Sequence, residues 1–167
     1  MKGLKLAFSD SDYVAEEEIK VIAIQAPGIP SYTLVHFLNK RLSWDLRHTG
    51  QCYYPGSAPA FSGDLFNYVM EVDRVQCFLL PNRDERSCWV TEVPDVDYWM
   101  VLTGGGLDVF DWKGLVDEVS GIGMIFYVNL YPWRVEGRRP AKNGQVFGRF
   151  QEFYMDMDEQ GLLQRFD

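Results

Sequence analysis

The chain of 167 residues contains little of what several protein classes require: three cysteines, two histidines, and no apolar run long enough to span a bilayer. Cys52, Cys77 and Cys88 are odd in number and widely spaced, which matches neither a disulfide framework nor a zinc-ligand spacing. His36 falls within a helical pattern and His48 in the loop after it, with no local cysteine-protease or nucleophile-elbow motif. The sequence therefore offers no recognisable catalytic nucleophile, and we interpret Cys77 and Cys88 as packing residues.

Phosphate-binding glycine motifs are also missing. The triple glycine at 104–106 lies between an apolar strand and a helix, a place where helix N-termini attract anions. However, the chain has no Gly-x-Gly-x-x-Gly and no Gly-Lys-Ser/Thr, and Asp108 and Asp111 occupy the positions that a phosphate would approach. We interpret the glycines as a hinge followed by a helix cap, and we expect no cofactor.

Positive charge is scarce. Sixteen Lys and Arg stand against 24 Asp and Glu, a net charge of −8, which disfavours nucleic acid and anionic membranes as partners. The exception is a basic island of four cations, which could contact an anion or a partner, although we favour a loop that is solvated or paired with the chain's own carboxylates. Its members are Arg134, Arg138, Arg139 and Lys142.

The first residues alternate apolar and polar side chains and then become acidic, without the charged and apolar pattern of an export signal. We therefore expect a cytoplasmic protein whose thiols are reduced.

What the chain does have is ordinary globular composition, 47% hydrophobic and 24% charged, with a high aromatic content of 15%. We predict one α+β domain, with a mostly antiparallel β-sheet and two main helices packed on one face in two layers. Its core occupies residues 1–133, and residues 134–167 form a basic loop and a C-terminal extension packed on the same domain. If the other sheet face stays uncovered, it needs a partner or a second copy.

The element predictions rest on apolar periodicity and on turn residues. We expect a helix that Ile29-Pro30-Ser31 opens and whose apolar positions continue to Leu42, and a second helix that Asp111 caps and that Gly121 and Gly123 end. Residues 52–63 are expected to form a surface loop, and 147–157 are either helix or strand. The expected strands are 3–9, 19–25, 44–47, 65–71, 75–80, 98–102 and 124–130.

Residues 90–98, Val-Thr-Glu-Val-Pro-Asp-Val-Asp-Tyr, precede the apolar strand. This stretch resembles the signature that names the IPExxxVDY family of small bacterial proteins. Glu92 falls on the signature Glu, and Val96, Asp97 and Tyr98 fall on Val-Asp-Tyr. Val90 replaces the signature Ile and Thr91 the signature Pro, while a proline stands instead at Pro94. The resemblance implies a fold and no activity, because the family has no established one.

Glu92, Asp95 and Asp97 place three carboxylates within six residues. Paired carboxylates can hold Mg²⁺ or share a proton, which is the functional interpretation. The structural interpretation is an acidic loop that caps backbone amides or pairs with arginines such as Arg83 and Arg86. We favour the structural interpretation and predict that Asp97 stabilises the fold.

Three hypotheses for the function follow. The first is a non-enzymatic binding or adaptor domain that acts through protein–protein interaction, with a protein partner or self-association. The alternative is a small-molecule-binding protein or enzyme with a site around Glu92, Asp97 and Tyr98. The third, nucleic-acid association through the basic island, conflicts with the net charge. We expect no metal and no membrane partner, and favour the first hypothesis because no catalytic constellation is visible.

Overall fold

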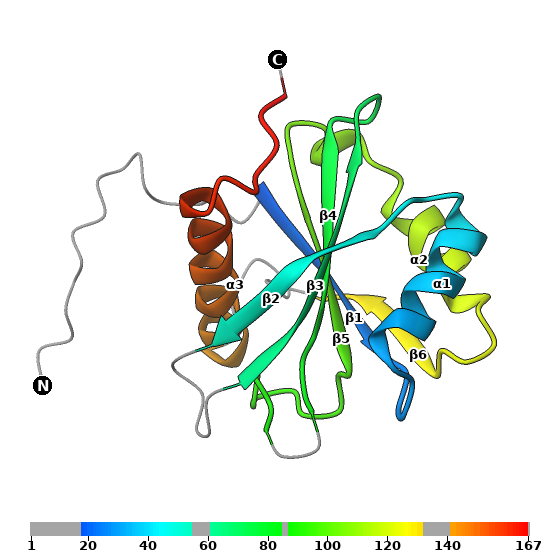
Figure 1. The fold of residues 1–167 in the computed structure, drawn as a ribbon, viewed down its shortest axis with the longest axis vertical. Helices are drawn as coiled ribbons and strands as arrows, with labels where there is room; N and C mark the ends of the chain where they lie inside the picture. Colours follow the sequence, from blue (N-terminus) through cyan, green and yellow to red (C-terminus); the bar gives the residue numbers. More distant parts are fainter. Residues whose placement is uncertain (1–17, 55–60, 85–86, 132–140, 167) are drawn as a thin grey trace, which may run out of the picture.

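A computed structural model describes residues 18–54, 61–84, 87–131 and 141–166 (Figure 1). Its centre is a six-stranded sheet in the order β2-β3-β4-β5-β1-β6, in which every neighbouring pair is antiparallel. The strands are β1 (Ile19–Gln25), β2 (Arg47–Tyr54), β3 (Phe61–Met70), β4 (Val75–Pro81), β5 (Tyr98–Thr103) and β6 (Tyr127–Leu130). The helices are α1 (Ser31–Leu42), α2 (Trp112–Ser120), α3 (Ala141–Glu159) and the short 3-10 helix η2 (Leu107–Val109). The predicted α+β class is confirmed.

Both faces of the sheet are covered by helices (Figure 1). Helices α1 and α2 pack on one face, as the sequence predicted, through buried residues such as Leu34, Leu38 and Val119. Helix α3 covers the other face with Phe147, Phe150 and further apolar side chains. The two-layer prediction is therefore corrected to three layers, because the undecided C-terminal segment is a helix with an apolar face of its own.

Strand β5 is central, and all six of its residues are buried because both of its faces are covered. Pairing starts at Tyr98, four residues after Pro94, where the expected strand 98–102 begins. The predicted boundaries of β1 and α1 are also confirmed, and Asp111 caps α2 by accepting a hydrogen bond from the Gly114 amide at 2.9 Å.

Three local predictions need correction. The predicted strand at 44–47 begins only at Arg47, and the predicted loop at 52–63 supplies the end of β2 and the start of β3. Cross-strand pairing with neighbours outweighed the turn-forming composition of these residues. Strand β6 is shorter than expected and lies at the edge of the sheet, and its side chains alternate between a buried position on the α1 and α2 face, Val128, and exposed positions, Tyr127 and Asn129. The strand predicted at 3–9 lies outside the described residues.

The triple glycine lets two backbone segments touch. A Cβ on Gly106 would lie 1.7 Å from the carbonyl oxygen of Asp73, and one on Gly104 would lie 2.3 Å from that of Arg74. Gly104 also has a φ of 125°, which side chains rarely allow. The Gly106 amide donates to the Arg74 carbonyl at 3.1 Å. The glycines therefore allow the β3–β4 turn to pack directly onto the start of η2.

Candidate functional site

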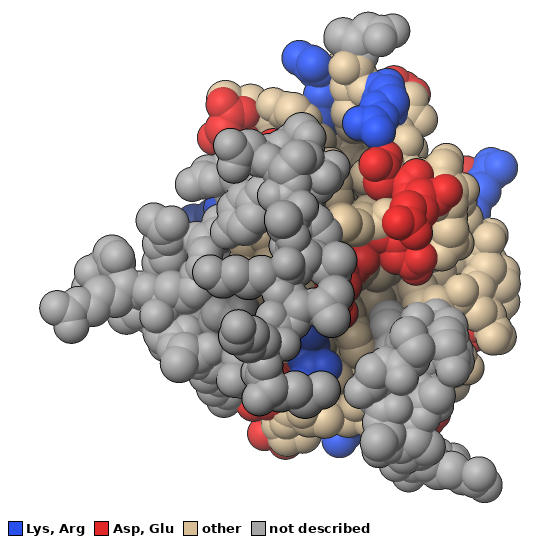
Figure 2. All heavy atoms as spheres, turned by 90° about the vertical axis from the view of Figure 1, so that its left-hand side faces the viewer, with Lys and Arg blue, Asp and Glu red and all other residues tan. Residues whose placement is uncertain are grey.

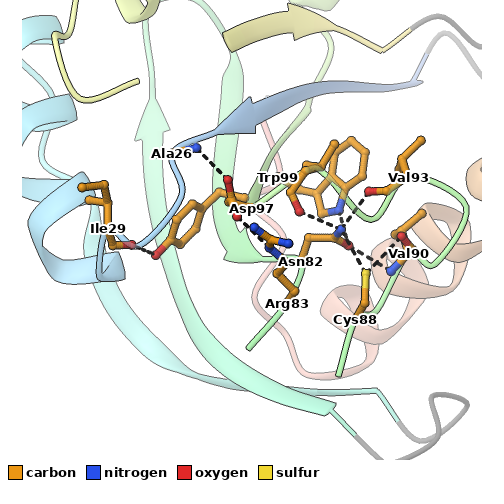
Figure 3. A network of polar contacts seen from close by, with 11 residues as sticks. Ala26, Ile29, Asn82, Arg83, Cys88, Val90, Val93, Asp97 and Trp99 are labelled. Carbon is orange, nitrogen blue, oxygen red and sulfur yellow. Dashed lines mark hydrogen bonds and ion pairs between the residues drawn. The ribbon is translucent and has the colours of Figure 1, made fainter. Parts of the chain in front are cut away.

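The loop from Asn82 to Asp97, which joins β4 to β5, is organised by one buried side chain (Figure 3). The Asn82 side chain is 0% exposed, and its Oδ1 accepts from the Val90 amide at 2.9 Å and from Trp99 Nε1 at 2.8 Å. Its Nδ2 donates to the carbonyls of Val96 at 2.9 Å and Val93 at 3.3 Å. The side-chain amide of Asn82 thus supplies hydrogen bonds to backbone groups of the loop that a neighbouring strand would supply in a sheet.

Asp97 joins this loop to the end of β1. It is 7% exposed, and its Oδ2 accepts from the Ala26 amide at 2.8 Å while Oδ1 accepts from Arg83 Nε at 2.7 Å (Figure 3). These are the two contacts expected from the structural interpretation, an amide cap and an arginine pair. Asp97 therefore has both oxygens engaged within the protein.

Tyr98 extends the same connection to α1, because its hydroxyl donates to the Ile29 carbonyl just before the helix begins. Burial, and secondarily the nearby charge of Asp97, raises the Tyr98 pKa to about 12. The hydroxyl therefore stays protonated as a donor at neutral pH. Within the signature-like stretch, Asp97 and Tyr98 hold the framework together.

Glu92 faces a different neighbour. Its Oε1 accepts from an Arg149 guanidinium nitrogen of α3 at 3.0 Å, whereas its Oε2 is buried without a hydrogen-bond partner among the described residues. Burial alone would raise the Glu92 pKa, but the hydrogen bond and charge of Arg149, together with hydrogen bonds from the Glu92 amide and the Thr91 side chain, outweigh it and lower that pKa below its ordinary value. The carboxylate is therefore charged at neutral pH and has unused acceptor capacity.

Glu92 also lines a cleft of about 340 Å³ on the face of the sheet that α3 covers. The floor consists of side chains from the β1 and β6 edge of the sheet, and the wall is the loop 92–96. The floor residues are Ala23, Gln25, Tyr127, Asn129, Leu130 and Tyr131. Asp95 is exposed on the wall, so the cleft carries two carboxylates, and no Lys or Arg occurs among the described residues that line it.

Strand β6 beside the cleft is an uncharged sheet edge, with the sequence Tyr-Val-Asn-Leu. Its register pairs Gln25 with Tyr127 and Ala23 with Asn129, and the Tyr131 amide donates to the Val21 carbonyl at 2.8 Å. Because an antiparallel strand turns alternate residues toward its neighbour, the backbone groups of Val128 and Leu130 face away from β1. The Leu130 amide is capped by Asn129 Oδ1 at 2.9 Å, which leaves the Val128 amide and two carbonyls at the edge.

The structure separates the predicted site residues. Glu92 lines the cleft, whereas Asp97 and Tyr98 are committed to the framework. Arg134, Arg138 and Arg139 lie outside the described residues, and Lys142 falls in the first turn of α3. Nowhere in the described ranges do three or more His, Cys, Asp or Glu side chains gather as a metal site. Burial raises the pKa of the Cys77 and Cys88 thiols.

Sequence reasoning missed Asn82 and the exposed face of β6. Asn82 sits in a charged, turn-like stretch, and nothing in its neighbours indicates complete burial. In β6 a signal was present: Tyr127 and Asn129 alternate with Val128 and Leu130, which is the pattern of a half-exposed strand. The apolar residues just before it obscured that pattern.

Comparison with protein-family models, curated proteins and solved structures gives no match for this chain. None of the helices in the described part of the chain has the length and apolarity to cross a membrane.

Proposed function

We propose that this protein is a non-enzymatic binding domain that recognises an extended segment of another protein along the edge strand β6. The observation that carries the proposal is the uncharged edge of β6 next to a cleft, an edge that pairs with no further strand among the described residues. An extended peptide can add a strand to such an edge: main-chain hydrogen bonds supply affinity, and neighbouring pockets select side chains.

The two edges of the sheet differ in a way that favours β6. The other edge, β2, has a bulge between His48 and Gly50, and Arg47 on it pairs with Asp45 at 2.6 Å. Bulges and charged side chains are devices that keep sheet edges from pairing with other chains. Strand β6 has neither device along Tyr127–Leu130. Within this strand, the hydrogen bond to Asn129 Oδ1 occupies the Leu130 amide.

Exposed aromatic residues support docking at this edge. Phe126 is 83% exposed just before β6, and Tyr127 is 48% exposed on the cleft floor. Aromatic side chains provide a large contact area, and tyrosine keeps a polar end for solvent or a partner. Together with the backbone groups of Val128, they form a surface that an incoming strand would cover.

The cleft also supports the alternative function, small-molecule binding. Its volume of about 340 Å³ lies at the lower end of the range for ligand pockets. Catalysis has less support, because two of the three residues on which that hypothesis relied, Asp97 and Tyr98, are held by framework hydrogen bonds.

The test is a selection of random ten-residue peptides on the immobilised protein, followed by amide hydrogen exchange of the complex by NMR. Enriched peptides are expected to slow exchange of the Val128 amide by about tenfold or more, while the amides of the turn at 71–74 keep their rates. In fluorescence anisotropy, Tyr127→Ser should weaken binding. Tyr32→Ser, which changes another exposed tyrosine, serves as the control.

Enriched peptides that protect amides elsewhere, or that bind Tyr127→Ser as well as the original protein, would contradict the proposal. A selection that enriches no peptide would contradict it as well. Protection of residues 92–96 by a small compound without any peptide effect would favour the alternative.

A further inference from the structure

The chemistry of the cleft allows the partner to be specified further. Glu92 and Asp95 both line it, and the cleft lining contains no Lys or Arg within the described residues. Arg149 contacts one oxygen of Glu92, the second oxygen is buried without a hydrogen-bond partner among the described residues, and Asp95 is the exposed carboxylate. A site of this kind attracts a cation and repels an anion.

The position of the cleft relative to β6 sets the length of the side chain that can reach it. A strand docked on β6 would lie about 5 Å farther out, and every second side chain would project over the face that carries Tyr127 and Asn129. The cleft floor continues past β6 to Ala23 and Gln25 of β1. A side chain must therefore cross one strand to meet Glu92, which requires a long residue.

We propose, on the basis of the proposed function, that the docked segment carries a lysine or arginine whose charged end enters the cleft beside Glu92 and Asp95. Its aliphatic stem covers the Tyr127 ring, and its charged end meets the carboxylates. Long cationic side chains behave in this way, burying their stems on apolar surface while the charge stays at a polar site.

A second copy of this chain is a poorer occupant of the edge. Pairing β6 with β6 would bring two acidic clefts together on chains that each carry a net charge of −8. Strand β6 itself supplies no cation, since Tyr127–Leu130 is uncharged. Acidic side chains also gather on the described part of the side that α3 covers (Figure 2). Charge complementarity thus selects a basic foreign segment.

The experiment uses the peptides enriched by the selection. They are expected to contain a Lys or Arg. Replacing this residue with Gln should weaken binding about tenfold, and replacing it with Glu should weaken binding further. Both affinities are measured by anisotropy at low ionic strength. Added salt should shrink the difference between Lys and Gln peptides.

Variants of the protein locate the effect. We compare the affinity of the Lys peptide with that of the matching Gln peptide. The ratio of these two affinities should move closer to one in Glu92→Gln and in Asp95→Asn. Asp95 is exposed, so its variant tests the idea even if loss of the Arg149 pair unfolds the Glu92 variant. Asp73→Asn is the matched control, an exposed aspartate at the opposite end of the sheet, and should leave the ratio unchanged.

The outcomes separate this inference from the proposed function. Peptides that protect the Val128 amide but bind equally well with Lys, Gln or Glu would overturn the cationic partner and leave the binding edge intact. A ratio that Asp95→Asn and Glu92→Gln leave unaltered would also overturn it. If light scattering finds a salt-insensitive dimer that Tyr127→Ser dissociates, the edge belongs to a second copy. A selection without enriched peptides would defeat both proposals.

Discussion

At the scale of single residues, the stretch 90–98 combines two roles that its sequence does not distinguish. Asp97 and Tyr98 are turned inward, where they tie the loop to β1 and to the start of α1. Glu92 and Asp95 line the cleft. The same acidic composition thus supplies framework contacts and a surface with unused charge, and the difference lies in which buried amide each carboxylate can reach.

Replacing Asp97 tests the framework role. Asp97→Ala removes the acceptor for the buried Ala26 amide, so we expect a loss of about 2 kcal/mol in the free energy of unfolding and a lower melting temperature. Asp97→Asn should lose less, because an amide oxygen can still accept that hydrogen bond. Asp95→Ala, an exposed change two residues away, is the control in thermal melts followed by circular dichroism. An unchanged melting temperature for Asp97→Ala would show that the contact does not stabilise the fold.

Asn82 should be more sensitive to substitution. Asn82→Ala leaves the Trp99 indole, the Val90 amide and the Val96 carbonyl without their buried partner, with an expected loss of about 3 kcal/mol or more. Urea unfolding monitored by tryptophan fluorescence measures it. Asn129→Ala on the exposed edge should change stability by less than about 1 kcal/mol. Equal losses in the two variants would mean that the network around Asn82 is not special.

At the scale of elements, the glycines at 104–106 have no side chains and so let the β3–β4 turn pack closely against the start of η2. The turn residue Arg74 has a φ of 55°, and its carbonyl receives the Gly106 amide. The phosphate-binding motifs are missing from the sequence at this point, and in the structure the glycines allow close contact between two backbones.

Substitutions within the triple glycine should therefore differ sharply. Gly106→Ala would place a methyl group against the Asp73 carbonyl, and we expect a loss of about 2–4 kcal/mol. Gly105→Ala meets only the Arg74 guanidinium, at 3.6 Å, and should cost about 1 kcal/mol or less. Denaturant titration of both variants gives the comparison, and similar losses would exclude close packing as the reason for Gly106.

At the scale of the whole molecule, α3 completes a three-layer structure. Its apolar residues cover the sheet, and Trp89 of the loop contacts Phe150 edge to face with ring centroids 5.0 Å apart. The pair of Glu92 with Arg149 adds one charged contact between this layer and the wall of the cleft. Stability and the shape of the cleft are therefore linked through α3.

The pH dependence of stability should reveal this link. The Glu92 pKa is lowered in the folded protein from its ordinary value of 4.5, so the pair stabilises the fold above that pH and the contribution is lost as the pH falls through the folded pKa. Melting temperatures of the original protein and Glu92→Gln should differ at pH 6 and converge toward pH 3. A constant difference across that range would show that the pair contributes no pH-dependent stability.

The sequence predicted the elements whose signals are local. The apolar run of β5, the apolar periodicity of α1 and α2, and the Asp111 cap of α2 were expected and are present. These depend on neighbours within a few residues. Strand pairing of 52–54 and 61–63 was missed because hydrogen bonds to a partner strand outweigh a loop-like composition.

By itself, the sequence determined the α+β class and the acidic balance, because apolar periodicity and charge are properties of the chain. Only the tertiary structure decided which carboxylate is buried, that α3 closes the second face and that β6 is an edge. Those properties depend on contacts between residues far apart in the chain, such as Ala26 and Asp97, which are 71 positions apart. The cleft exists because the loop 92–96 folds beside β1 and β6, and no local pattern specifies that contact.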